Sequence, residues 1–192
     1  MQSPPEFLLS AEDRRAILGY ARDSVHAAVL RTAPPVAPAQ GAFRTSCGVF
    51  VTVHIQGKLR GCIGVVEAVE PLSASIVHCA AGAALRDPRF SPIRAEELSG
   101  VEIEVSLLSP PAPILASQIE LGRHGLIVAK GHRRGLLLPQ VAVQHRLSRE
   151  QFLAETCRKA GLAGDAWESD EVSILGFECA VFSDHSELRR ED

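Results

Sequence analysis

The sequence predicts an α+β fold in which a largely antiparallel sheet is flanked by helices. Two observations predict this class. First, several segments alternate apolar and polar residues with period two, and short turns join them in pairs, which is typical of hairpins. Second, segments with helical spacing separate those pairs. The length of 192 residues favours one domain, and the apolar fraction of 46% is enough to build a sizeable core.

The first helix is predicted from about residue 11 to residue 31. Ser10, with Asp13 three residues later, resembles a capping box, and apolar residues then recur at helical spacing. We expect the helix to stop at the prolines that follow, because proline bars the preceding residue from helical geometry. The proline-rich stretch 33–42 is therefore a connector and the best candidate for a mobile loop.

Two more helices and six strands follow from the same kinds of signal. Pro71 suits the first position of a helix that runs to about residue 85. Ser148 caps a third helix with Gln151 completing a capping box, and Gly161 suits its left-handed C-terminal cap. The strands are predicted at residues 49–56, 59–66, 101–107, 126–129, 135–138 and 173–182.

The most distinctive segment is Leu59-Arg60-Gly61-Cys62-Ile63-Gly64, in which two glycines bracket a cysteine within a strand. Glycine in a strand usually marks a bulge, a bend or a close backbone approach. If residues 57–58 form a two-residue turn, Val53 opposes Cys62 and the thiol lies on the apolar face of the hairpin. A bulge at Gly61 or a longer turn would put it on the other face, because a slip of one residue flips every side chain.

Two interpretations of Cys62 remain open. In the catalytic one, Cys62 is a nucleophile or redox thiol, and Arg60 lies two residues earlier on the same face of the strand and lowers the pKa of the thiol. In the structural one, Cys62 is a small buried hydrophobe, which is the usual fate of a free cysteine.

Polar residues elsewhere could complete a site. Arg89, in the segment Asp87-Pro88-Arg89-Phe90, could grip a carboxylate or another anion through its planar guanidinium, or it could pair with a nearby acid while Asp87-Pro88 ends the helix. Glu102 and Glu104 share one face of their strand. They could bind a metal, share acid–base work or position a substrate, although pairing with Arg60 or Arg89 is the commoner arrangement.

Composition limits the class of function. A net charge of −3 argues against a nucleic-acid or membrane footprint over the whole surface. The first ten residues do not have the pattern of a signal peptide, and no apolar run approaches the roughly 18–20 residues that span a bilayer. The five cysteines lack the spacing of a zinc knuckle or redox motif, so we expect reduced thiols and a cytoplasmic protein.

An RNA-binding role stays open as a further alternative. Arg123, His124 and the turn 130–134 carry local positive charge that could contact phosphates, although the acidic net charge and the lack of interleaved aromatic residues favour a solvated turn. The sequence contains no phosphate-binding glycine loop, no nucleophile elbow and no His-Glu-x-x-His, so those enzyme classes are disfavoured. No cofactor and no metal is predicted.

Several blocks of the sequence resemble, in the same order, those of the AMMECR domain family, whose bacterial members are called AmmeMemoRadiSam system protein A. Beside Leu59–Gly64 these blocks are Asp87-Pro88-Arg89-Phe90, the Glu-x-Glu-x-Ser strand at 102–106, Gly122-Arg123-His124-Gly125, residues 135–141, residues 159–162 and Trp167. The resemblance implies one domain over residues 8–183 with a larger and a smaller subdomain. We expect frayed termini at 1–7 and 184–192.

The resemblance also implies partners, a Memo-type protein and a radical S-adenosylmethionine enzyme, but no reaction. We therefore expect an accessory component that docks to them, with an enzyme acting through Cys62 and an RNA-binding module as the alternatives. Candidate catalytic residues are Arg60, Cys62, Glu102 and Glu104. Candidate binding residues are Gly61, Ile63, Gly64, Asp87, Arg89 and His124.

Overall fold

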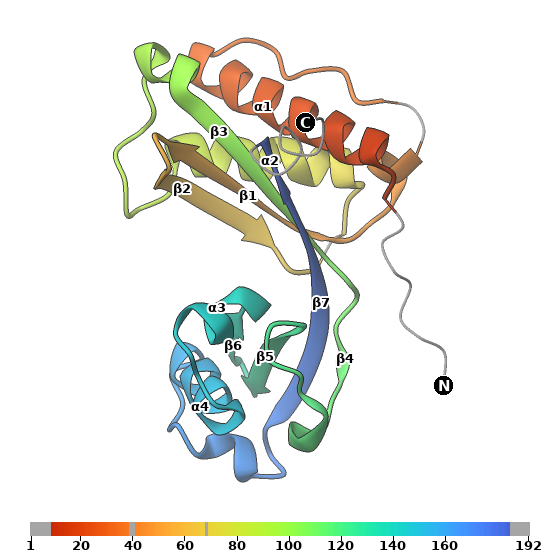
Figure 1. Ribbon diagram of the computed structural model, residues 1–192, viewed down its shortest axis with the longest axis vertical. Coiled ribbons are helices and arrows are strands. Elements are labelled where there is room, and N and C mark those ends of the chain that lie inside the picture. The colour runs from red at the N-terminus through yellow and green to blue at the C-terminus, as the bar shows by residue number, and fades with distance from the viewer. Residues whose placement is uncertain (1–8, 39–40, 68, 185–192) are drawn as a thin grey trace. The chain divides into compact units, whose positions relative to one another are not determined.

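The computed structural model of the chain describes residues 9–38, 41–67 and 69–184. It divides into two compact units, a larger unit of residues 1–107 and 180–192 and a smaller unit of residues 108–179. Both units combine helices with antiparallel strands (Figure 1), so the predicted α+β class is confirmed. The expected frayed ends lie outside the described residues except at Asp184, whose carboxylate accepts a hydrogen bond from the Ile103 N–H at 2.6 Å and pairs with Arg22.

The larger unit packs two helices on one face of a sheet. Its elements are α1 (Ala11–Leu30), β1 (Gly48–Ile55), β2 (Lys58–Val65), α2 (Leu72–Leu85), β3 (Val101–Leu108) and the last residues of β7 (Ser173–Ser183). The strand order is β2-β1-β3-β7, with β2 outermost. Alternate residues of β1 and β3, among them Val51 and Ile103, are buried with the inward faces of α1 and α2 (Figure 1).

The predicted capping box of the first helix in the larger unit is confirmed, whereas the predicted place of Pro71 is wrong by one residue. Ser10 and Asp13 form a reciprocal capping box, with the Asp13 N–H donating to Ser10 Oγ at 3.0 Å. α1 ends at Leu30, within one residue of the expected stop, and Arg31 follows in the left-handed region with φ of 57°. Pro71 is the N-cap of α2 rather than its first residue. Of the connector 33–42, residues 39–40 lie outside the described ranges, and residues 41–44 form a short 3₁₀ helix.

The predicted register of the first hairpin is wrong. The turn residues are Gln56 and Gly57, both with positive φ (53° and 69°), so the turn begins one residue earlier than the proposed 57–58. A bulge between Val53 and His54 then shifts the register, so that Val53 opposes Gly61 and Thr52 opposes Cys62. Cys62 therefore lies on the face opposite to Val51 and Val53, as the alternative with a bulge required.

The smaller unit is a sheet covered by two helices. Its elements are β4 (Ala112–Pro113), β5 (His124–Lys130), β6 (Arg133–Leu137), α3 (Pro139–Gln144), α4 (Arg149–Lys159) and the first residues of β7. β7 pairs with β4 and β5, and β5 pairs with β6. The Ser148–Gln151 capping box and the left-handed Gly161 (φ 71°) are confirmed. α3 was not predicted, because six residues are too few to show helical periodicity.

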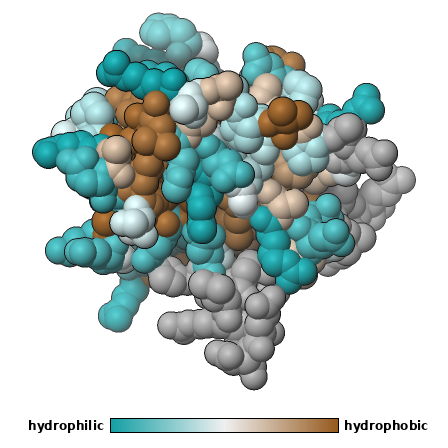
Figure 2. Space-filling model, turned by 90° about the horizontal axis from the view of Figure 1, so that it is seen from above, coloured by the Kyte–Doolittle hydropathy of each residue, from teal (hydrophilic) through white to brown (hydrophobic). Residues whose placement is uncertain are grey.

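Short 3₁₀ helices lie between the longer elements, and the surface carries both polar and apolar side chains. The 3₁₀ helices are Gly41–Arg44, Ala95–Gly100, Ala116–Gln118 and Ala166–Glu168. Figure 2 shows one face of the molecule, on which polar side chains surround patches of apolar ones. Within the described residues, no helix combines the length and the apolar character that crossing a membrane requires.

Candidate functional site

The glycines of Leu59–Gly64 allow β2 to approach its neighbours closely. A Cβ atom on Gly61 would lie 2.0 Å from the carbonyl oxygen of Ala83 in α2. A Cβ on Gly64 would lie 2.2 Å from the ring of Phe50, on the other face of the hairpin. Ile63 packs on Gly82 of α2. The glycines are therefore explained by packing, and the candidate binding residues Gly61, Ile63 and Gly64 hold the strand against a helix and a ring.

Cys62 is a half-buried thiol on the side of the sheet that faces away from α1 and α2. Its Sγ lies 3.2 Å from Thr52 Oγ1, which donates a hydrogen bond to it. Burial raises the pKa of the Cys62 thiol, and this effect outweighs the hydrogen bond from Thr52 and the positive charge of Arg89, both of which lower it. At neutral pH the thiol is therefore protonated and a weak nucleophile.

Asp87 and Arg89 cap the outer edge of the sheet at Cys62. The Cys62 N–H donates to Asp87 Oδ2 at 2.9 Å, and the Arg89 guanidinium lies 3.5 Å from the Cys62 carbonyl oxygen. Asp87 also accepts three hydrogen bonds from Arg89, through the backbone N–H, Nε and Nη2, at 3.1, 3.0 and 2.7 Å. Side chains thus take the place of a further strand beside β2. These hydrogen bonds, chiefly those from the Arg89 side chain, hold the pKa of the buried Asp87 carboxyl well below its usual range.

Arg60 does not direct its guanidinium to Cys62. Its Nε and Nη2 donate to the Glu97 carboxylate at 3.0 and 3.3 Å, and its remaining contacts are the carbonyl oxygens of Ser91 and Pro92. In return, the hydrogen bond from Arg60 lowers the pKa of Glu97. Arg60 therefore fixes the loop after α2 onto the hairpin.

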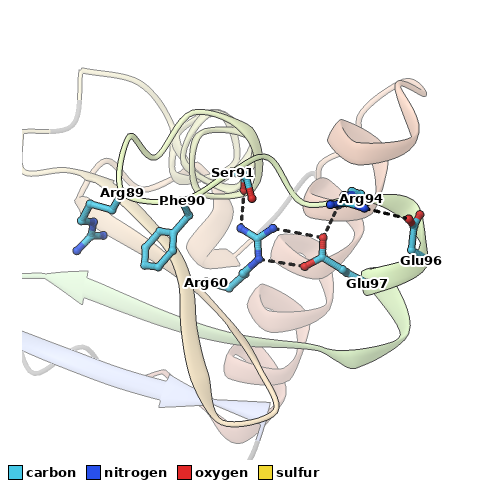
Figure 3. Close-up of a pocket in the computed structure, with 7 residues that line it drawn as sticks. All are labelled: Arg60, Arg89, Phe90, Ser91, Arg94, Glu96 and Glu97. Atoms are coloured by element: carbon cyan, nitrogen blue, oxygen red, sulfur yellow. Dashed lines mark hydrogen bonds and ion pairs between the residues drawn. The ribbon is translucent and has the colours of Figure 1, made fainter.

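These residues surround a pocket of about 600 Å³, the arginine pocket, which is shown in Figure 3. It is lined by Arg60, Arg89, Phe90, Ser91, Arg94, Glu96 and Glu97. The side chains of Arg89 and Arg94 are 56% and 76% exposed, and the Arg89 guanidinium lies 5.4 Å from the centre of the Phe90 ring. The rim of the pocket therefore offers exposed guanidinium donors beside a half-buried aromatic ring.

The other candidate residues lie outside the arginine pocket. Glu102 and Glu104 are half-buried on the face of β3 that points away from the helices, and Glu104 contributes only a charge that raises the pKa of Cys62. Arg60 and Arg89 pair with Glu97 and Asp87, so the expected pairing with Glu102 or Glu104 is wrong.

His124 belongs to the smaller unit, where its Nδ1 accepts a hydrogen bond from the Glu120 N–H at 3.0 Å. The neighbouring Arg123 pairs with Glu120 and Glu178. Of the basic turn, Lys130 pairs with Glu171 and Arg133 donates to the carbonyl oxygen of Gly161. Much of the local positive charge is therefore already bound to acidic or carbonyl groups of the protein itself.

Sequence reasoning missed two contributors, Glu97 and Arg94. Glu97 also accepts a hydrogen bond from the Arg94 N–H at 2.9 Å, and an acidic residue at the third position of a short helix is a capping signal that could have drawn attention to it. Within the described residues, no three His, Cys, Asp or Glu side chains are grouped so that they could hold a metal ion.

Comparison with known proteins places the chain in a family, and the matched region includes both the hairpin and the loop after α2. The sequence profile of the AMMECR1 family matches residues 18–182. The chain belongs to the AMMECR1 family. Among its relatives, a protein of Methanothermobacter thermautotrophicus is 45% identical over 73% of this chain and 77% of its own length. Protein MJ0810 of Methanocaldococcus jannaschii is 37% identical over 92% of each chain.

The fold of this chain is also seen in a solved structure. The crystal structure of the uncharacterized protein PH0010 from Pyrococcus horikoshii superposes with a TM-score of 0.85 at 35% identity, covering 92% of this chain and 94% of that one. The resemblance to the family that the sequence blocks indicated is thus confirmed.

Proposed function

We propose that the chain is an accessory protein that binds its partners through the surface around the arginine pocket. The observation that carries this proposal is the arrangement of the charged residues. Arg60, Asp87 and Arg89 build and hold the loop 87–97. Arg89 is still 56% exposed there, Phe90 is half-buried, and Arg94 is 76% exposed. The segment Leu59–Gly64 then serves as a rigid support for a recognition surface.

The chemistry of Cys62 supports binding over nucleophilic catalysis. A catalytic thiol needs a lowered pKa, which a neighbouring cation or base usually provides. Here burial raises the pKa, and Arg60, the residue expected to lower it, is bound to Glu97. Two features still favour an enzyme that uses the thiol: Cys62 faces away from the helices, and the charge of Arg89 partly offsets the rise in pKa that burial causes.

The composition of the pocket rim supports protein recognition. Arginine and aromatic side chains are enriched at protein interfaces and among the residues that dominate binding energy. Among the residues that the structure describes, the guanidinium of Arg94 has only a long contact of 3.9 Å with Glu96, and both side chains are more than 70% exposed. A partner carboxylate could therefore replace this contact at little cost.

The proposed partners are a Memo-type protein and a radical S-adenosylmethionine enzyme, as the family resemblance implies. The test is co-purification of the tagged chain with these two proteins under anaerobic conditions. We expect a complex with the natural chain, loss of it with Arg94→Glu, and retention with Arg44→Glu, which makes the same charge change at an exposed position of the same unit. Failure of the natural chain to retain either protein would contradict the proposal.

A further inference from the structure

We propose that the smaller unit binds a small amphipathic monocarboxylate, an apolar chain that ends in a carboxylate, in a pocket beside α3 and α4. This pocket, the α3–α4 pocket, has a volume of about 520 Å³ and is lined by Leu137, Val141, His145, Leu147, Glu155, Arg158 and Lys159. Its size lies within the range of about 300–1,000 Å³ that is usual for ligand sites. All seven residues belong to the smaller unit, and the site is independent of the function proposed above.

The floor of the α3–α4 pocket is apolar. Leu137 at the end of β6, Val141 in α3 and Leu147 after α3 pack against the buried cluster that contains Leu126 and Phe152. All three floor residues stay half-buried rather than buried. An apolar chain lying on them would remove this surface from water, which is favourable.

The rim of the same pocket carries an excess of positive charge. Arg158 pairs with Glu155 one turn earlier in α4, which leaves the ammonium group of Lys159 and the ring of His145. Across the part of the chain that the structure describes, no carboxylate pairs with Lys159. An apolar ligand with one carboxylate would contact both the apolar floor and this positively charged rim. A neutral apolar molecule would contact the floor alone, and a small anion the rim alone.

The walls of the pocket are preformed. α3 is closed by a Schellman motif, in which the Leu147 N–H donates to the Ala142 carbonyl oxygen at 2.9 Å and Arg146 takes a φ of 51°. α4 is closed in the same way, with the Leu162 N–H donating to the Cys157 carbonyl oxygen at 2.9 Å. These motifs fix the helix ends that carry His145 and Lys159, so a ligand meets a site that needs little ordering.

The test uses octanoate as the probe and amide chemical shifts of the whole chain as the readout. We expect saturable shifts in the residues that line the pocket, with acetate and octan-1-ol each binding at least about tenfold more weakly than octanoate. The variant Lys159→Gln should weaken octanoate binding about tenfold and leave octan-1-ol binding unchanged. Lys58→Gln, with the same charge change in the larger unit, is the matched control and should bind octanoate like the natural chain.

Three results would overturn the proposal. The first is that octanoate leaves the amide chemical shifts of the lining residues unchanged. The second is that acetate or octan-1-ol binds as tightly as octanoate. Tight binding of acetate would mean that the rim alone accounts for the affinity, and tight binding of octan-1-ol would mean that the floor alone does. The third is that Lys159→Gln binds octanoate as tightly as Lys58→Gln does. Trp167, the single tryptophan of the chain, lies in the smaller unit, and its fluorescence shows whether that unit of the variant is folded.

Discussion

Replacing Gly61 by alanine tests whether packing against α2 holds the Leu59–Gly64 segment in place. The added Cβ would lie 2.0 Å from the Ala83 carbonyl oxygen and 2.9 Å from its carbonyl carbon, and both are backbone atoms that no rotamer change can move. Ordinary contact distances for such atoms are above 3 Å, so β2 must shift away from α2 by about 1 Å. Overpacking of this kind costs about 1–3 kcal/mol, and a clash with backbone belongs at the upper end.

Thermal unfolding followed by circular dichroism measures this loss. With about 3 kcal/mol lost and about 2–4 °C per kcal/mol in a chain of this size, the melting temperature should fall by about 6–12 °C. The fluorescence of Trp167 reports the smaller unit separately, and its transition should change less than that of the larger unit. The control is Gly19→Ala, on the exposed face of α1 with no atom within 4 Å of the new Cβ, which should gain about 0.5–1 kcal/mol. A Gly61→Ala variant as stable as the natural chain would refute the packing explanation.

Three further predictions follow from the same contacts. Because the pKa of Cys62 is raised, its alkylation by iodoacetamide should be slower at pH 7 than that of a free thiol and should increase toward pH 9 and above; rapid labelling at pH 6 would contradict this. Because the pKa of Asp87 is lowered on folding, its contribution to stability is present above its unfolded pKa of about 4 and is lost as the pH falls toward the folded value. Asp87→Asn should therefore cost about 2 kcal/mol at pH 7 and less at pH 3, as measured by urea unfolding, whereas an equal cost at both pH values would exclude the ionised carboxylate as the cause. Arg146→Gly should stabilise the chain by up to about 1 kcal/mol because glycine adopts the φ of 51° without strain, and Arg146→Ala should bring no such gain; thermal unfolding that ranks the two variants equally would contradict the reasoning.

The elements that depend on local chemistry could be predicted from the sequence. Ser10 with Asp13 and Ser148 with Gln151 form capping boxes within one turn, so neither helix start needs information from elsewhere in the chain. The hairpin register could not be fixed in this way. It depends on Gln56 accepting a left-handed conformation, which few non-glycine residues adopt, and on a bulge that shifts the pairing by one residue.

The candidate site was predicted in part for a similar reason. The sequence predicted Arg60, Cys62, Asp87 and Arg89 as candidates, but it could not say which pairs form. Arg60 meets Glu97 across 37 positions of sequence, and Asp87 reaches Cys62 across 25. Contacts at such separations are set by how the loop after α2 crosses the edge of β2, and no residue pattern near Arg60 specifies that path.

We propose that Leu59–Gly64 supports a recognition surface and does not carry a catalytic thiol. The most direct measurement is the affinity of the Memo-type protein for two variants, Cys62→Ser and Arg94→Glu, determined by anaerobic calorimetry beside the natural chain. We predict that Cys62→Ser binds within about twofold of the natural chain and that Arg94→Glu binds at least about tenfold more weakly. Loss of binding in Cys62→Ser with full binding in Arg94→Glu would contradict the account.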